Sequence, residues 1–381
     1  MKPKLIALLA VFALVVAACG GGDANPTTTT AAPVATTTTA ATPGVTTPPA
    51  TTTTTEVDPM ADWPDSVIFA FIPSERAESL NDTILPFMEY LSETLGIDVE
   101  GVVTADYNGL VVAMGTGGAD FGAFGPLGYV QAKDQYPSIV ALAQSIRFGS
   151  DLYYGQWFTN DPGICDSDPV VGGFENINGV PTILPVTEVK ALQVGWKYID
   201  GVLGQEVLDD GTIVEQGLVC NASLDKIKGK TVAFTSATST SGAVYPQLQL
   251  LNLGIDIEND INYEYLGSHD STVAAVYDGT FDIGLSYGDA RRTLRKDKTD
   301  VGTKLIVFNI TPDIPNDVIT ANGSLPQSLL DAMYAAIETY LGTEEGELVL
   351  DEIYGWTDIR PAVESDFDVV REAVKKLGIS Q

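Results

Sequence analysis

Thr231–Leu253 reads TVAFTSATSTSGAVYPQLQLLNL and joins three patterns in one short stretch. The β-rich run Thr231–Phe234 predicts a strand, and the apolar residues of Gly242–Leu253 predict a helix after it. The loop between them, Ser236–Gly242, is crowded with hydroxyl side chains. One hydroxyl at a helix start is commonly an N-cap, but several in succession, beside free backbone N–H groups, are typical of an oxyanion site. The stretch therefore predicts an anion-binding loop at the carboxyl end of a strand.

Strands and helices alternate on both sides of this stretch. Downstream, the pattern predicts strands at Ile261–Tyr265, Ile283–Ser286 and Leu305–Asn309, with a helix at Thr272–Tyr277. Upstream, it predicts strands at Val67–Ile72, Asp98–Val103, Phe121–Phe124 and Ile139–Ala143, separated by helices. Strands interleaved with helices predict an α/β fold with mostly parallel sheets flanked by helices.

A long segment between the two alternating blocks breaks the pattern. Asp161–Asn221 is rich in Gly, Pro and Asp and predicts an irregular insertion, with Cys165 and Cys220 near its ends. In an exported protein these two cysteines are expected to form a disulfide that closes the insertion. The alternative is a pair of free buried thiols.

The N-terminus has the pattern of an export signal. Leu5–Ala18 is an apolar run of 14 residues after two lysines, too short for a bilayer core that needs about 20 residues. It ends in Val16-Ala17-Ala18-Cys19-Gly20, which resembles a bacterial lipobox. The resemblance implies residues 1–19 as lipoprotein signal peptide and lipobox, with a lipid on Cys19 that anchors an extracytoplasmic protein to the cell membrane. An ordinary signal peptide with a chance cysteine is the alternative. Residues 20–61, dominated by Thr, Ala and Pro, predict a disordered tether.

Composition excludes several classes of function. The 381 residues carry 20 Lys and Arg against 51 Asp and Glu, so the formal charge is 20 − 51 = −31. This balance excludes a broad basic face for nucleic acid. One histidine and three cysteines reach the four ligands of a closed His/Cys zinc cluster only if every one of them takes part, which nearly excludes such a cluster, and we expect no cofactor.

The single histidine favours binding over catalysis. Gly284–Gly288 matches the G-x-S-x-G nucleophile elbow, but His269 precedes Ser286, against the order Ser, acid, His of hydrolases with this motif. We therefore expect no enzyme. His269 follows the expected strand Ile261–Tyr265, which places it at the same sheet edge as the hydroxyl loop, where ligands of open α/β sheets gather. It could donate a hydrogen bond to an oxyanion there, and a purely structural histidine is the alternative.

Six collinear motifs carry a family resemblance. They are Ile72-Pro73-Ser74-Glu75, Ala105-Asp106-Tyr107, Phe124–Tyr129, Ser239-Thr240-Ser241-Gly242, Gly267-Ser268-His269-Asp270 and Ile314-Pro315-Asn316-Asp317. In this order they resemble the PhnD-like substrate-binding proteins of phosphate, phosphite and phosphonate ABC transporters.

The resemblance implies a two-lobed periplasmic-binding-protein fold of type II that closes at a hinge. Lobe 1 would comprise residues 62–160 and 310–381, the insertion residues 161–222, and lobe 2 residues 223–309. The implied contacts to phosphonate oxygens are Tyr107, Tyr153 (or the adjoining Tyr154), Ser239, Thr240, Ser241 and His269. Asp289 and Asp317 match the positions that meet the ammonium of aminoalkylphosphonates, although Asp289 could instead be a helix N-cap.

The expected function is capture of a phosphonate, phosphite or phosphate and its delivery to the transmembrane subunits of an ABC import permease. We expect a monomer, held at the membrane through its N-terminal lipid. The alternative is a surface sensor or adhesin on the same fold. Two features depart from the family: the insertion beside the hinge, and Thr238, where the family often has glycine.

Overall fold

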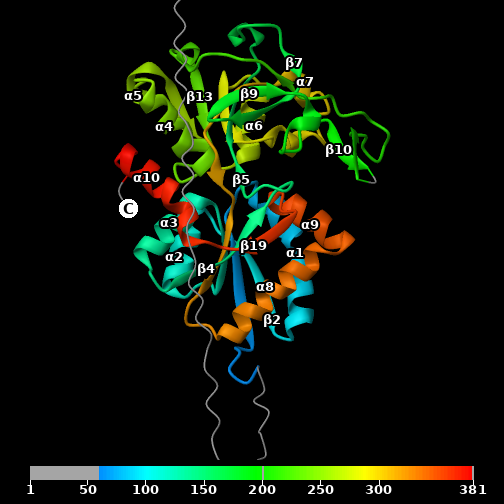
Figure 1. Ribbon diagram of the computed structural model, residues 1–381, viewed down its shortest axis with the longest axis vertical. Helices are drawn as coiled ribbons and strands as arrows, with labels where there is room; N and C mark the ends of the chain where they lie inside the picture. The colour runs from blue at the N-terminus through cyan, green and yellow to red at the C-terminus, as the bar shows by residue number, and fades with distance from the viewer. Residues whose placement is uncertain (1–59, 200, 380–381) are drawn as a thin grey trace, which may run out of the picture. The chain divides into compact units, whose positions relative to one another are not determined.

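The computed structural model describes residues 60–199 and 201–379. The predicted signal peptide, Cys19 and the tether up to residue 59 lie outside the described residues. Within the described ranges, no helix is both long enough and apolar enough to cross a membrane. The described chain forms two lobes, each a mixed sheet flanked by helices (Figure 1).

Lobe 1 is built on a six-stranded sheet in the order β19-β4-β18-β3-β1-β2. The strands are β1 (Ser66–Phe71), β2 (Asp98–Val103), β3 (Phe121–Phe124), β4 (Ile139–Ile146), β18 (Val318–Asn322) and β19 (Asp358–Pro361). The helices are α1 (Ala77–Leu95), α2 (Tyr107–Thr116), α3 (Pro126–Gln135), α8 (Gln327–Leu341), α9 (Glu344–Tyr354) and α10 (Asp368–Leu377).

Alternation along β1 explains why lobe 1 has two cores. Phe69 and Phe71 pack with α1, α8 and α9 on one face of the sheet, whereas Ala70 and the following Ile72 pack with α2, α3 and α10 on the other. A strand presents successive side chains to opposite faces, so a strand that is apolar at nearly every position must be covered on both. The end of the sheet that faces lobe 2, where the parallel strands finish, is not covered by these helices and carries loops.

Lobe 2 repeats this plan on a seven-stranded sheet in the order β14-β13-β15-β6-β16-β12-β7. The strands are β6 (Gly155–Thr159), β7 (Val170–Val171), β12 (Leu218–Val219), β13 (Thr231–Phe234), β14 (Asn262–Tyr265), β15 (Ile283–Tyr287) and β16 (Ile306–Ile310). The helices are α4 (Tyr245–Asn252), α5 (Ile257–Asp260), α6 (His269–Tyr277) and α7 (Val301–Lys304).

Two chain crossings connect the lobes and correct one expected lobe boundary. The chain leaves lobe 1 after β4 and returns after β16, and the crossing strands β5 (Leu152–Tyr153) and β17 (Ile314–Pro315) pair antiparallel as a hinge. After each crossing, the chain enters the sheet of the other lobe from the cleft. The strand that follows, β6 in lobe 2 or β18 in lobe 1, therefore runs antiparallel to its neighbours. Most strands of each sheet still run in one direction, as expected, and a minority of reversed strands makes the sheets mixed. The expected lobe boundary at residue 160 is wrong, because β6 lies inside the lobe 2 sheet.

The insertion is an extension of lobe 2 rather than an irregular loop. Its strands β7 and β12 continue the lobe 2 sheet, and two hairpins project from it, formed by β8 (Gly173–Ile177) with β9 (Val180–Leu184) and β10 (Trp196–Ile199) with β11 (Val202–Gln205). Cys165 and Cys220 form the predicted disulfide, with Cα atoms 5.7 Å apart. Cys220 is buried in the lobe 2 core, so the disulfide fastens the start of the insertion to the sheet edge.

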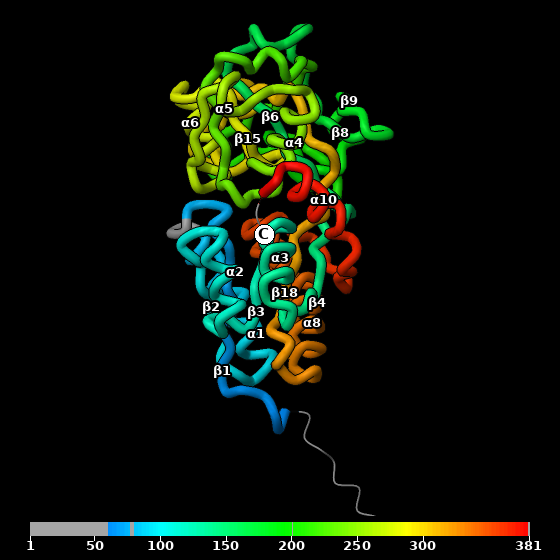
Figure 2. Tube along the Cα trace, turned by 90° about the vertical axis from the view of Figure 1, so that its left-hand side faces the viewer, coloured from blue at the N-terminus to red at the C-terminus, as the bar shows by residue number. Residues whose placement is uncertain are grey.

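Helix α10 makes a further link between the lobes. It packs on α3 of lobe 1 and on α4 of lobe 2, and its Val370 shares a buried cluster with Tyr245 of α4. Figure 2 shows α10 at the junction of the two lobes. Together with the hinge strands, this helix brings the carboxyl ends of β1, β3, β13 and β14 to face one another across the cleft.

Candidate functional site

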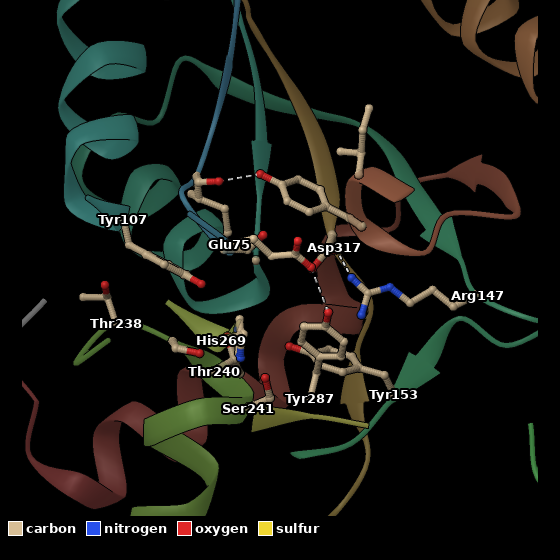
Figure 3. A pocket seen from close by; sticks show the side chains of 16 residues that line it. Glu75, Tyr107, Arg147, Tyr153, Thr238, Thr240, Ser241, His269, Tyr287 and Asp317 are labelled. Carbon is tan, nitrogen blue, oxygen red and sulfur yellow. Dashed lines mark hydrogen bonds and ion pairs between the residues drawn. The ribbon is translucent and has the colours of Figure 1, made fainter. Parts of the chain in front are cut away.

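A small cavity lies between the lobes where these strand ends meet. Its volume is about 40 Å³, which limits its contents to a few non-hydrogen atoms. Seven of the eight predicted ligand-binding residues line it: Tyr107, Tyr153, Ser239, Thr240, Ser241, His269 and Asp317 (Figure 3). Of the two neighbouring tyrosines, Tyr153 lines the cavity and Tyr154 does not. No residue of the insertion, 161–222, lines this cavity.

The hydroxyl loop enters the cavity as the start of a helix. A π-helical turn, Thr240–Val244, leads directly into α4, and the Ser239 side chain caps it by accepting a hydrogen bond from the Gly242 N–H at 3.1 Å. Ser239, Thr240 and Ser241 are each at most 3% exposed. The N-cap interpretation is thus correct for Ser239, while the hydroxyls of Thr240 and Ser241 remain on the cavity wall.

Three other helices also begin at the cavity wall. Tyr107 is the first residue of α2, Gly125 precedes α3, and His269 is the first residue of α6. The N-terminal end of a helix carries a partial positive charge. Four such ends directed at one cavity favour an anion there without a free cationic side chain.

His269 is held as a neutral donor or acceptor. Its Nδ1 lies 2.8 Å from the Ser286 hydroxyl and 3.3 Å from that of Thr235, which leaves Nε2 as the ring nitrogen for the cavity. Burial, and secondarily the charge of Arg147, lower the pKa of His269 to about 3. The ring is therefore uncharged at physiological pH. Ser286 is fully buried behind it and does not line the cavity, so the G-x-S-x-G match places no nucleophile there.

The two tyrosines bring phenol groups from lobe 1 and the hinge. Tyr107 is 5% exposed, and its hydroxyl lies near Ser239 but has no hydrogen-bond partner within the described protein. The Tyr153 hydroxyl lies near the Ser241 side chain. Burial raises the pKa of both phenols above its usual value, so both stay protonated and can donate. An unpaired buried donor at a cavity wall is costly unless a ligand accepts from it.

Asp317 lines the cavity but has a partner already. Its carboxylate forms an ion pair with Arg147 and accepts a hydrogen bond from the Trp356 indole N–H at 3.2 Å. Arg147 also lies over the ring of Tyr153, with 5.0 Å from its guanidinium carbon to the ring centroid. Figure 3 shows the guanidinium between Asp317 and the two tyrosine rings of the cavity wall, Tyr153 and Tyr287.

Glu75, like Arg147, lines the cavity although no role was predicted for it from the sequence. Its carboxyl accepts a hydrogen bond from the Tyr287 hydroxyl at 3.2 Å. Burial, and then the charge of Asp270, raise the pKa of Glu75 to about 7; the hydrogen bond from Tyr287 opposes this shift, and Glu352 and Arg295 make smaller contributions of opposite sign. It belongs to one of the six motifs, so its position was visible, but a carboxylate is not expected at an anion site.

Asp289 is the predicted ligand residue that the structure does not bring to the cavity. Its two carboxylate oxygens bind Arg291 at 2.9 and 2.8 Å, and both side chains are buried. It also accepts from the backbone N–H groups of Val194 and Arg291, the latter as the cap of a short 3-10 helix. The expectation of a ligand contact is therefore wrong, and the N-cap alternative is correct. The sequence signal for this was Arg291, two residues away.

The two lobes are in direct contact around the cavity. The Thr240 hydroxyl of lobe 2 accepts from the Leu127 N–H of lobe 1 at 3.0 Å, and the His269 N–H donates to the Ser74 carbonyl at 2.8 Å. Three ion pairs surround these bonds, Arg76–Asp270, Arg292–Asp351 and Lys296–Glu352. The structure is thus the closed arrangement of the lobes.

Comparison with known proteins gives a consistent family. Residues 69–367 match the model of a family described as ABC transporter, phosphonate, periplasmic substrate-binding protein. The phosphate-import protein PhnD of Mycolicibacterium smegmatis is 24% identical over 332 residues, which cover 83% of this chain and 87% of that protein. The probable ABC transporter phosphite binding protein PhnD1 of Prochlorococcus marinus is 23% identical over 256 residues, 67% of this chain and 69% of that one.

Solved structures share the fold. PhnD1 from Prochlorococcus marinus, in complex with methylphosphonate, superimposes with a TM-score of 0.62 at 21% identity and covers 84% of this chain and 99% of that chain. A binding protein component of an ABC phosphonate transporter from Pseudomonas aeruginosa gives a TM-score of 0.58 at 16% identity, covering 81% of this chain and 85% of that chain.

Proposed function

Since the family match spans most of its length, the chain belongs to the periplasmic substrate-binding proteins of phosphonate ABC transporters, and we propose that it captures a phosphonate, phosphite or phosphate for import. The observation that carries this ligand class is the inter-lobe cavity: buried hydroxyls, one neutral imidazole and four helix N-termini face a volume of about 40 Å³. These groups suit a small, multiply charged oxyanion and offer little to an apolar ligand.

Binding uses groups from both lobes, which makes it dependent on closure. Lobe 2 contributes Thr240, Ser241 and the Nε2 of His269, and lobe 1 contributes the Tyr107 hydroxyl. If Ser286 donates to Nδ1, the neutral ring carries its proton on Nε2 and donates to the anion. The anion then adds hydrogen bonds across the same cleft that the Thr240–Leu127 bond already spans, so it stabilises the closed form.

The proposal extends to attachment and delivery. Lipid on Cys19 would hold the receptor at the outer face of the membrane, where closed, loaded lobes meet the ABC permease. Substitution of Cys19 by Ser should move the protein from the membrane fraction to the soluble fraction. Retention in the membrane, or a mature N-terminus other than residue 19, would contradict the anchor. Growth on the bound compound as phosphorus source, with and without the gene, separates import from a sensor or adhesin role.

The binding proposal is tested by calorimetry and thermal shift with phosphate, phosphite, methylphosphonate and sulfate. A ligand at 100 times its Kd should stabilise the folded protein by about 2.7 kcal/mol. Ser241→Ala should weaken binding at least tenfold, whereas Ser236→Ala, in the same loop but off the cavity wall, should not. Absence of any phosphorus ligand, or equal losses in both variants, would refute the site.

A further inference from the structure

We propose that Glu75 makes this pocket selective for oxyanions that bring a proton with them, such as a phosphonate monoanion, over sulfonates of the same shape. The inference rests on the proposed function and names a residue that determines specificity within it. In the complex, one proton lies between the Glu75 carboxyl and a ligand oxygen. A phosphorus oxyanion can supply that proton, whereas a sulfonate has none to supply.

Glu75 is the carboxyl of the cavity wall that no cation compensates. The wall has two carboxyl groups, and the other one, Asp317, forms an ion pair with Arg147. Within the described part of the chain, Glu75 forms no ion pair. The Tyr287 hydroxyl donates to its Oε1 at 3.2 Å, as the dashed line in Figure 3 marks, which leaves Oε2 for a ligand.

The surroundings of Glu75 hold its proton up to neutral pH. Burial is the largest cause, and the negative charge of Asp270 on α6 comes next. Glu352 on α9 acts in the same direction, while the hydrogen bond from Tyr287 on β15 and the charge of Arg295 act against it. With a pKa of about 7, the carboxyl changes its state in the pH range where phosphonates do.

The histidine and the tyrosines of the cavity wall do not change their state in this range. Burial, and then the charge of Arg147, lower the pKa of His269 to about 3. Burial raises the pKa values of the phenols above their usual range, at Tyr107, Tyr153, Tyr287 and Tyr354. Glu75 is therefore the group whose proton decides whether this part of the wall donates to a ligand or accepts from it.

Anion binding then depends on that proton. An unprotonated ligand oxygen beside an ionised Glu75 would place two like charges in a cavity of about 40 Å³, which is unfavourable in a buried site. A phosphonate, phosphite or phosphate loses its second proton near neutral pH, as a phosphate ester does at about pH 6, so its monoanion presents a P–OH donor. A sulfonate is fully ionised in water, so Glu75 must first take a proton from the solvent. The pocket should therefore exclude sulfonates increasingly above the pKa of Glu75.

The test compares methylphosphonate with methanesulfonate, an isostere that carries no proton. Because methanesulfonate does not titrate, the pH dependence of its affinity belongs to the protein alone. Calorimetry on the wild-type protein should show a fall of about tenfold in methanesulfonate affinity from pH 6 to 8, since the protonated fraction of Glu75 falls from about nine-tenths to about one-tenth.

Two variants separate the carboxyl from the general charge of the cleft. Glu75→Gln offers an amide N–H in place of the proton, so at pH 8 it should bind methanesulfonate about tenfold more tightly than the wild-type protein, without pH dependence. Asp297→Asn is the matched control. It removes a negative charge from an exposed side chain of the same cleft that does not line the cavity, and it should leave methanesulfonate affinity unchanged.

The outcomes separate the two proposals. A wild-type protein that binds methylphosphonate and, at pH 8, takes methanesulfonate as tightly refutes the selectivity and leaves the proposed function intact. A folded Glu75→Gln variant that gains no affinity for methanesulfonate shows that another group makes the distinction. A wild-type protein that binds no phosphorus oxyanion refutes the function. Should the variant not fold, the wild-type protein still decides: a methanesulfonate affinity that is not about tenfold higher at pH 6 than at pH 8 refutes the role of Glu75.

Discussion

Replacement of Tyr107 by Phe removes one oxygen atom from the cavity wall and nothing else. The Tyr107 hydroxyl is buried and has no hydrogen-bond partner within the described protein, so the unliganded protein loses no interaction. A hydrogen bond to a charged group contributes about 1.5–3 kcal/mol. If the hydroxyl donates to a bound oxyanion, Tyr107→Phe should weaken affinity by roughly 10- to 150-fold.

The stability of the unliganded Tyr107→Phe variant should stay the same or increase, although its affinity falls. A buried hydroxyl without a partner is unfavourable by about 1–3 kcal/mol, so the unliganded variant should unfold at the same or a higher denaturant concentration. Tyr340→Phe is the matched control: its hydroxyl is likewise buried and unpartnered, but it lies in the lobe 1 core against Phe87 and Tyr90. It should change stability similarly and affinity not at all.

The assay is isothermal titration calorimetry with methylphosphonate or phosphite, beside urea unfolding of the unliganded variants. An affinity of Tyr107→Phe within threefold of the wild-type value would show that the phenol makes no contact with the anion. A large loss of stability in Tyr107→Phe would show that the hydroxyl has a structural partner. Either result would refute the reasoning that an unpaired buried donor marks the ligand position.

Three further changes test other parts of the site. Glu75 ionises above its pKa of about 7, and the carboxylate then repels an anion. The affinity of the wild-type protein should therefore fall about tenfold between pH 6 and 8 relative to that of Glu75→Gln, with both measured on the same ligand so that the ligand's own ionisation cancels. A wild-type to Glu75→Gln affinity ratio that stays constant with pH would contradict this. Thr240→Val removes the acceptor for the Leu127 N–H and should weaken binding at least tenfold through loss of closure, read by calorimetry and small-angle scattering; a variant that closes normally would exclude that route. Replacing Cys165 and Cys220 by Ala should lower the free energy of unfolding by about 4 kcal/mol, because the disulfide joins residues separated by 55 positions. It should leave Kd unchanged, since no residue of the insertion lines the cavity, and a large change in Kd would link the insertion to binding.

The sequence predicted which polar side chains of lobe 2 would come together, because their placement follows simple rules. Hydroxyls at a helix start and a histidine after the next strand must meet where parallel strands end, and β13 and β14 are indeed parallel neighbours. Tyr107 and Asp317 belong to motifs whose order matches the family, whereas Tyr153 was implied only by the family resemblance, with Tyr154 as the alternative.

The sequence did not predict how the charged residues Arg147, Glu75 and Asp317 are arranged, because that depends on which side chains form ion pairs and hydrogen bonds in the folded protein. We expected β4 to end at Ala143, since Gln144 and Ser145 interrupt the apolar run, but both are buried at the hinge and the strand continues to Ile146. Arg147 therefore follows directly on the strand and reaches the cavity. The prediction for Asp289 was wrong for a similar reason. Its position in the sequence matches the family, but a 3-10 turn places Arg291 so that it binds both carboxylate oxygens of Asp289.

These pairings explain how a strongly acidic chain can hold an anion. The formal charge of −31 acts over long distances, where salt screens it, whereas binding is decided at contact. On the cavity wall Asp317 is compensated by Arg147, Glu75 is protonated below a pH of about 7, and His269 is neutral. The wall is then close to neutral, and the helix N-termini give it a positive potential. The acidity of the surface and the affinity of the pocket for oxyanions are therefore independent properties of this protein.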